Sequence, residues 1–157
     1  MNDFDYYKNL PKKRMGAIAI ICNQNRELLI VKPNYKERWL FPGGVVEENE
    51  SPMAACIREV KEEVGIELIH IQFLCVDYVP ANSEKDESVQ FVFYGGELSS
   101  GSTIKVDGKE ITDYRFVVFA EAARLLGLGR SLAKRLPACL TALKKQHPSY
   151  LEDGVEV

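Results

Sequence analysis

Residues 43–66 read GGVVEENESPMAACIREVKEEVGI, and this stretch determines how the rest of the chain is interpreted. Its second half carries the start and stop signals of a helix. Ser51 is a good N-cap, Pro52 suits the first helical position, and Gly65 suits the residue that follows the last turn. Together these signals predict a helix over residues 51–65.

Three glutamates share one side of this predicted helix. At about 100° per residue, Glu59, Glu62 and Glu63 occupy an arc of roughly 100°. The apolar residues form a separate stripe that we expect to face the core: Met53, Ile57, Val60 and Val64. Like charges four residues apart destabilise a helix by about 0.2–0.5 kcal/mol. The acidic side is therefore either a solvated face or a set of oxygen ligands for a hard divalent cation such as Mg²⁺.

The segment before the helix favours the metal-binding interpretation. Gly43 and Gly44 permit backbone conformations that other residues avoid, so that a carbonyl can turn toward an ion. Glu47, Glu48 and Glu50 add negative charge beside the helix, and without a cation this charge would increase the repulsion. A glycine pair alone is weak evidence for a metal site, but a glycine pair at a fixed distance from three glutamates is much stronger evidence for one.

Apolar runs elsewhere in the chain predict a sheet with helices on its faces. The expected strands cover residues 15–22, 27–31, 68–79, 88–98 and 111–119, and further helices cover 120–126 and 131–146. Pro137 lies inside the last helix and is expected to break or restart it. Because strands and helices do not alternate strictly, the pattern favours an α/β (α+β) fold with a mixed β-sheet.

The composition is that of an ordinary globular domain. The chain has 157 residues, of which 46% are hydrophobic and 27% charged, and its formal net charge is −3. We expect a single domain over 1–157, with a core at about 14–146 and a mobile acidic C-terminal tail at 148–157. The acidic balance disfavours nucleic acid as a partner. No apolar run reaches about 18 residues and the N-terminus lacks a signal-peptide pattern, so we expect no membrane span and a cytoplasmic protein.

The spacing of the central stretch follows a known pattern. Gly44 is followed by five residues and Glu50, and then by seven residues and Arg58-Glu59-Val60-Lys61-Glu62-Glu63-Val64-Gly65-Ile66. This resembles the signature of the Nudix hydrolases, G-x5-E-x7-R-E-U-x-E-E-x-G-U, in which U is a bulky aliphatic residue. Every defined position matches. The resemblance is sharp over 39–66 and loose over most of the remaining chain.

The resemblance implies an α/β/α sandwich and metal-dependent hydrolysis of the diphosphate linkage of a nucleoside diphosphate derivative. Carried over by position, the groups that would bind the metal are the side chains of Glu59, Glu62 and Glu63 and the carbonyl of Gly43. Arg58 would hold a glutamate in position by a charge-assisted hydrogen bond, and Glu50 would support the loop. The ion would be Mg²⁺, with Mn²⁺ as an alternative, and Glu59 is also a candidate base. Family members are often dimers, so a homodimer is one implied assembly.

Many family members use one further acid outside the helix, as a ligand or a base. The candidates here are Glu110, Asp113 and Glu97. We favour Glu110, which directly precedes the expected strand at 111–119. The alternative interpretation is that it is a solvated loop acid.

The resemblance leaves the substrate open between sugar nucleotides such as ADP-ribose and nucleoside triphosphates, with dinucleoside polyphosphates and capped RNA as further alternatives. Some ADP-ribose-cleaving members carry a proline about fifteen residues beyond the Nudix signature, here called the box, and this chain has Pro80 fifteen residues after Gly65. A proline at this place also simply ends a strand. The candidate substrate-binding residues are Trp39, Arg38, Phe41 and Tyr78. A catalytically silent domain that binds a nucleotide metabolite and regulates another process is the alternative function, and the intact box disfavours it.

Overall fold

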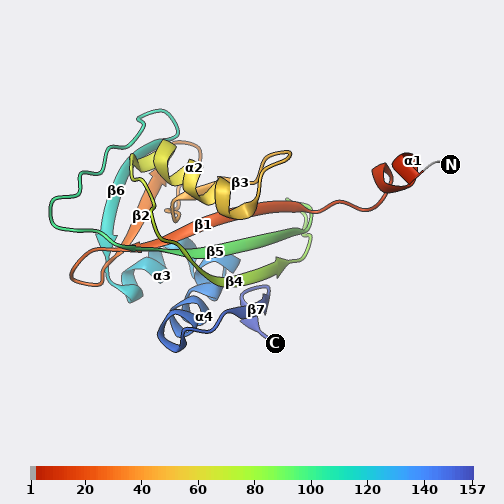
Figure 1. Cartoon of the computed structure of the whole chain (residues 1–157). Helices are drawn as coiled ribbons and strands as arrows, with labels where there is room; N and C mark the ends of the chain where they lie inside the picture. The colour runs from red at the N-terminus through yellow and green to blue at the C-terminus, as the bar shows by residue number, and fades with distance from the viewer. Residues whose placement is uncertain (1–2) are drawn as a thin grey trace.

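The computed structural model describes residues 3–157, in which one mixed sheet lies between helices (Figure 1). The strands are β1 (Arg14–Cys22), β2 (Leu28–Pro33), β3 (Gly43–Val45), β4 (Gln72–Val79), β5 (Ser88–Glu97), β6 (Ile111–Val117), β7 (Ser149–Glu152) and β8 (Val155–Glu156). The helices are α1 (Asp3–Lys8), α2 (Pro52–Val64), α3 (Phe119–Gly127) and α4 (Ser131–Lys145). These residues include no helix that is long and apolar enough to cross a membrane.

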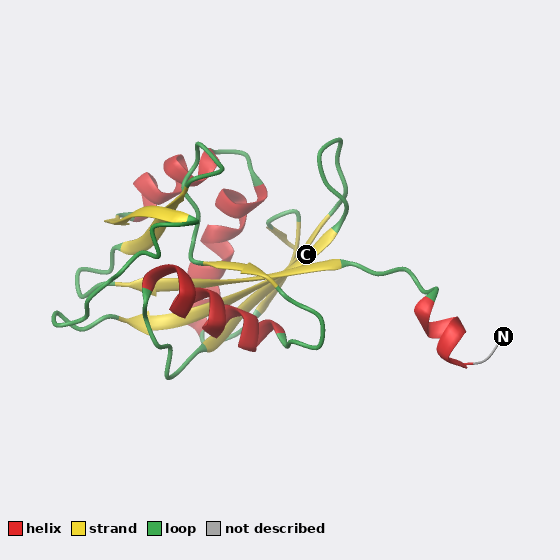
Figure 2. Cartoon of the chain, turned by 90° about the horizontal axis from the view of Figure 1, so that it is seen from above, coloured by secondary structure: helices red, strands yellow, loops and turns green. Residues whose placement is uncertain are grey.

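The sheet has the order β6-β2-β1-β5-β4-β7-β8, and the short β3 pairs with β1. β1 runs parallel to β5 and β4 runs parallel to β7, whereas the other pairings are antiparallel. Helix α2 covers one face, and α3 and α4 cover the other (Figures 1 and 2). In the view from above, α2 crosses in front of the strands. The predicted α/β/α sandwich with a mixed sheet is confirmed.

The two faces of the sheet have separate hydrophobic cores because side chains alternate along each strand. In β1, Ala17, Ala19 and Ile21 belong to the core under α2, whereas Ile20 and Cys22 belong to the core under α3 and α4. The β1 strand is therefore buried on both faces, which explains why its sequence is a nearly continuous apolar run. It provides a rigid support for β3 and the start of α2.

Helix α2 begins and ends where its sequence predicts. The Ser51 hydroxyl accepts a hydrogen bond from the Ala54 amide at 3.1 Å, and Gly65 adopts the left-handed conformation at φ 72°. Val60 and Val64 are fully buried as expected. The expectation for Met53 is wrong, because its side chain is 46% exposed. The buried side of the helix is rotated toward Glu63, so that one of the three glutamates faces the sheet.

Four expectations outside α2 need correction. Residues 148–157 are not a mobile tail, because β7 pairs with β4 and Leu151 is fully buried. Helix α4 continues through Pro137 without a break. The strand expected at 68–79 starts only at Gln72, and the strand expected at 111–119 ends at Val117, where α3 follows almost directly. The unpredicted α1 lies at the end of an extended segment away from the sheet, and none of its residues is buried (Figure 1).

Candidate active site

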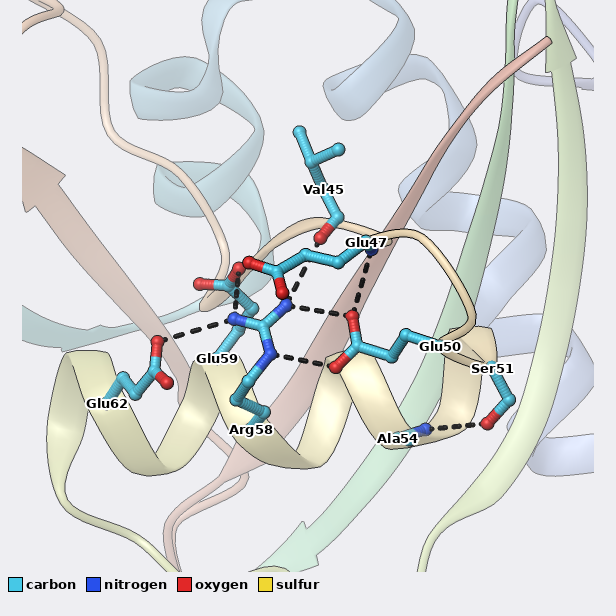
Figure 3. Close-up of polar contacts among 8 residues, drawn as sticks. All are labelled: Val45, Glu47, Glu50, Ser51, Ala54, Arg58, Glu59 and Glu62. Carbon is cyan, nitrogen blue, oxygen red and sulfur yellow. Dashed lines mark hydrogen bonds and ion pairs between the residues drawn. The ribbon is translucent and has the colours of Figure 1, made fainter. Parts of the chain in front are cut away.

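Arg58 organises the acidic side of α2 (Figure 3). Its Nε and Nη2 atoms donate to the two carboxylate oxygens of Glu50 at 2.8 and 2.9 Å, which is a bidentate pair. Its Nη1 atom donates to Glu59 Oε1 at 2.9 Å and to Glu62 Oε2 at 3.3 Å. Nη2 also reaches the carbonyl oxygen of Val45 at 3.3 Å. One guanidinium thus connects three glutamates with the loop that precedes the helix.

Glu50 attaches this loop to the helix. Its carboxylate accepts from Arg58 and, at 3.0 Å, from the backbone amide of Glu47. The hydrogen bonds from Arg58 and then from the amide of Glu47 lower the pKa of Glu50 to about 2. The side chain is therefore ionised throughout the physiological range, and it holds the loop in one position above α2.

Glu63 is a buried carboxyl group beside β3. Its side chain is only 6% exposed, and its Oε2 accepts a hydrogen bond from the Gly43 amide at 2.9 Å. Burial raises the pKa of Glu63 to about 8, and the negative charges of Glu59, Glu110 and Asp107 add to this effect. A buried acid among other acids is costly to ionise, and a nearby cation would relieve that cost.

Glu59 lies against Gly44 at the start of the same loop. A Cβ atom on Gly44 would lie 2.4 Å from Glu59 Oε1, so the carboxylate fits only because residue 44 is glycine. Gly43 has φ 142°, and a Cβ there would lie 2.2 Å from the carbonyl oxygen of Ala17. Burial raises the pKa of Glu59, and Glu62 and Glu110 act in the same direction against the opposing effect of Arg58.

Of the three candidate acids outside the helix, Glu110 is the one whose charge acts on this site. Its charge raises the pKa of Glu59, Glu63 and Tyr35, and its carbonyl accepts from the Asn34 amide at 2.8 Å. Glu97 instead lies near Cys22, whose pKa it helps to raise. Asp113 lies opposite Lys32 in the pairing of β6 with β2. Of the three acids, Glu110 is thus the one whose charge acts on both Glu59 and Glu63, and its role as the additional acid stays a prediction.

The donor set fits a hard divalent ion in its chemistry. Within residues 3–157, no three acidic, histidine or cysteine side chains are gathered closely enough to hold an ion as they stand. Arg58 holds Glu59 and Glu62, and the Gly43 amide holds Glu63. These groups offer carboxylate oxygens in excess of the positive charge beside them, which matches the preference of Mg²⁺ for oxygen ligands.

A cavity of about 490 Å³ opens next to the glycine pair, a volume typical of small-ligand sites. Gly43, Gly44, Arg38 and Phe41 line it. Trp39 does not line this cavity. Its side chain is buried, with 8% of its surface exposed, and the Arg115 guanidinium lies 4.8 Å from the centre of its ring.

Tyr78 is the second predicted substrate-binding residue that lies outside this cavity. Its hydroxyl donates to Glu87 at 2.6 Å. Sequence analysis missed Arg14, Lys85 and Arg130, which also line the cavity. They come from three distant segments, so no local motif could have joined them.

The comparisons with known proteins agree with this geometry. The family profile described as NUDIX domain matches residues 12–139. The chain is 33% identical over 97 residues to the m7GpppN-mRNA hydrolase of Saccharomyces cerevisiae, a match that covers 61% of this chain and 9% of that protein. It is 46% identical over 61 residues to an RNA pyrophosphohydrolase of Hydrogenovibrio crunogenus, covering 39% of this chain and 37% of that protein. The chain thus matches less than two thirds of the length of these relatives.

Solved structures show the same fold. The MutT protein of Methanosarcina mazei superposes with a TM-score of 0.57 at 25% identity, covering 72% of this chain and 83% of that chain. The NUDIX domain of Shewanella oneidensis NrtR, complexed with ADP ribose, superposes with a TM-score of 0.71 at 16% identity, covering 91% of this chain and 99% of that chain.

Proposed function

This chain belongs to the Nudix family, and from that premise we propose that it is a pyrophosphohydrolase that cleaves the diphosphate linkage of a nucleoside diphosphate derivative with the help of a divalent metal ion. The candidate substrates are sugar nucleotides such as ADP-ribose and nucleoside triphosphates, with dinucleoside polyphosphates and capped RNA as alternatives. The names of relatives, which include an RNA pyrophosphohydrolase and an 8-oxo-dGTP diphosphatase of Proteus vulgaris, support phosphoanhydride hydrolysis as the reaction.

The observation that carries this proposal is the concentration of acids around the glycine pair. Glu63 is buried, Glu59 is half-buried, and both have raised pKa values because burial and neighbouring carboxylates oppose their ionisation. A merely solvated acidic face would leave its carboxylates in water, where ionisation has little cost. An ion-binding site instead requires oxygen ligands to be held together in advance at some cost to the free protein.

Each residue of the network would have a separate role. Glu59, Glu62 and Glu63 would bind Mg²⁺ or Mn²⁺, and the Gly43 carbonyl is a further candidate ligand. The bound ion would neutralise phosphate oxygens and lower the pKa of the attacking water. Arg58 is a positioning residue, because it orients Glu59 and Glu62 while Glu50 anchors it to the loop.

Glu110 is the candidate general base. It directly precedes β6 and has no bond to Arg58, so its carboxylate is available to accept a proton from water. Glu59 is the alternative base, but its Oε1 atom is already occupied by Arg58. Glu110→Gln should therefore lower kcat more at neutral pH than at high pH, where hydroxide can replace the base.

A screen of nucleotide substrates tests the proposal. The purified chain is incubated with ADP-ribose, nucleoside triphosphates and dinucleoside polyphosphates in Mg²⁺, in Mn²⁺ and in EDTA, and products are separated by ion-exchange chromatography. We expect cleavage between two phosphorus atoms with either ion and none in EDTA. Tight binding of a nucleotide without turnover under every condition would instead support the silent regulatory domain.

A further inference from the structure

The cavity beside the glycine pair is lined by an unusual number of cations. Five of them come from four separate parts of the chain: Arg14, Lys36, Arg38, Lys85 and Arg130. Arg14 starts β1, Lys36 and Arg38 follow β2, Lys85 lies in the loop before β5, and Arg130 precedes α4. The whole chain has a formal charge of −3, so this concentration of positive charge is local and opposite in sign to the net charge.

These five cations have no ion-pair partner in the part of the chain that the structure describes. Two other basic residues of the cavity wall are neutralised, since Lys134 pairs with Asp153 at 2.7 Å and Arg135 pairs with Asp77 at 2.9 Å. Within residues 3–157, none of the five forms an ion pair with an acidic side chain. Besides Asp153, Glu84 is the acidic residue on the wall, and it cannot balance five positive charges.

The cations act on one another, which shows that they share one space. The pKa of Lys36 is lowered by burial and then by Lys85, Arg38 and Arg14. The pKa of Arg38 is lowered by burial and then by Arg130. Neighbouring cations thus repel Lys36 and Arg38, and a bound anion would relieve this repulsion.

The cationic cavity and the acidic site meet at the glycine pair. Gly43 and Gly44 form part of the cavity wall, while Glu59 and Glu63 contact the same two residues from the side of α2. An anion that enters the cavity and reaches the glycine pair would therefore share the cavity with the five cations. Because the cations and the acids of α2 lie on two sides of the same glycine pair, a chain of several phosphates bound there would have cations beside it and the proposed metal site next to it.

We propose that this cavity selects nucleotide substrates that carry three or more linked phosphates, in preference to sugar nucleotides with two phosphates. The inference rests on the proposed hydrolase function. One phosphoanhydride would lie beside Gly43 and Gly44, and the remaining phosphates would bind Lys36, Arg38, Lys85 and Arg130. Hydrolysis forms a bond from the water oxygen to one phosphorus, breaks the bond from that phosphorus to the bridging oxygen, and leaves two phosphate products that take up the protons of water.

Turnover of substrates with different phosphate numbers tests the selection. The value of kcat/KM is measured in Mg²⁺ for ADP-ribose, GTP, diadenosine tetraphosphate and an RNA oligonucleotide with a 5′-triphosphate. We expect at least a 10-fold preference for substrates with three or more phosphates over ADP-ribose. A preference for GTP or diadenosine tetraphosphate identifies free nucleotides as the source, and a preference for the oligonucleotide identifies RNA ends. ADP-ribose as the best substrate overturns the proposal.

Single substitutions test the cations themselves. Lys85→Gln and Arg130→Gln each remove one charge from the exposed part of the cavity wall, whereas Lys144→Gln removes an exposed charge at the end of α4 and is the matched control. We expect each cavity variant to reduce the ratio of kcat/KM for polyphosphates to kcat/KM for ADP-ribose by about 10-fold or more, which is the lower end of the effect of losing one hydrogen bond to a charged group. The control should leave the ratio unchanged. An equal loss on both substrate types overturns the proposal.

Binding without turnover separates this inference from the hydrolase function. Inorganic tripolyphosphate and pyrophosphate are titrated into the protein in EDTA by isothermal calorimetry. We expect tripolyphosphate to bind at least 10-fold more tightly, to weaken with added salt, and to bind less tightly to Lys85→Gln. If the enzyme hydrolyses nothing but this binding persists, the hydrolase function fails and the anion site stands. Equal binding of the two anions overturns the anion site even if the enzyme is active.

Discussion

Replacing Gly44 by alanine should damage catalysis while leaving the fold nearly intact. The new Cβ atom would lie 2.4 Å from Glu59 Oε1 and 2.5 Å from its Cδ atom, and ordinary contacts begin at 3.4 Å. The Glu59 carboxylate must therefore move by about 1 Å, and a displacement of that size can lower a catalytic rate by about 10²-fold. We expect kcat to fall by about that factor.

The stability of this variant should change little for two reasons. Gly44 lies outside the left-handed region, so alanine fits its backbone. The atoms that clash belong to the end of a flexible side chain, which can turn away. Alanine also restricts the unfolded chain, and we expect the free energy of unfolding to change by less than about 1 kcal/mol.

Gly43→Ala is the informative contrast. Its Cβ would lie 2.2 Å from the backbone oxygen of Ala17 and 2.6 Å from Ile18 Cα, and the φ of 142° is strained for alanine. Because β1 is a central strand, neither atom can move away, and we expect a loss of about 2–6 kcal/mol in unfolding free energy.

Gly101→Ala adds a methyl group where no atom lies within 4 Å, so it controls for glycine replacement alone. Urea unfolding and kcat are measured for all three variants. The reasoning is refuted if Gly44→Ala keeps wild-type turnover, or if it is as destabilised as Gly43→Ala.

Three further perturbations follow from the same contacts. In Arg58→Lys the lysine cannot form the bidentate pair with Glu50. We therefore expect urea unfolding to show a loss of about 1–3 kcal/mol in the free energy of unfolding, together with a lower kcat. Unchanged values would mean that the hydrogen bonds of Arg58 contribute neither to stability nor to catalysis. The pKa of Glu63 is raised to about 8 in the folded chain, so in EDTA the folded state holds a proton that the unfolded state releases between about pH 4.5 and 8. The free energy of unfolding should therefore fall as pH rises through this window, and Glu63→Gln should remove that component of the slope; an identical slope in the variant would exclude Glu63 as its source. Leu151→Ala should cost about 2–5 kcal/mol in thermal or urea unfolding, with near-normal kcat per folded molecule, whereas a negligible cost would restore the expectation of a mobile tail.

Local signals explain which parts of the fold could be predicted from the sequence. Ser51 and Gly65 determine the ends of α2 through bonds within a few residues, so both ends were predictable. The C-terminal hairpin was not, because β7 is held by pairing with the distant β4 and by Gly154, whose amide donates to the buried Asp77 at 3.0 Å. The exposure of Met53 was also missed, since periodicity gives the direction of a stripe but not the edge of the sheet below it.

The residues of the candidate site likewise fall into a group that the sequence could predict and a group that it could not. The acids of α2 and their partner Arg58 lie within one box, so spacing alone brought them together. The sequence favoured Glu110 from its place before the strand expected at 111–119 but left Glu97 and Asp113 open. The path of the chain around the sheet places the start of β6 near Glu59 and the end of β5 near Cys22. The cationic cavity could not be predicted, because Lys85 and Arg130 meet only after two distant loops have folded against the same wall.

The binding of Mg²⁺ to Glu→Gln variants, measured beside kcat, tests most directly whether the acidic side of α2 is a catalytic metal site. Glu62→Gln is the sharpest variant, because its side chain is 60% exposed and the substitution should not disturb the fold. We expect wild-type urea unfolding in EDTA, weaker Mg²⁺ binding by isothermal calorimetry, and a kcat on the best substrate lower by about 10²-fold or more. Unchanged Mg²⁺ affinity together with near-wild-type kcat in both Glu62→Gln and Glu59→Gln would contradict the proposed metal site.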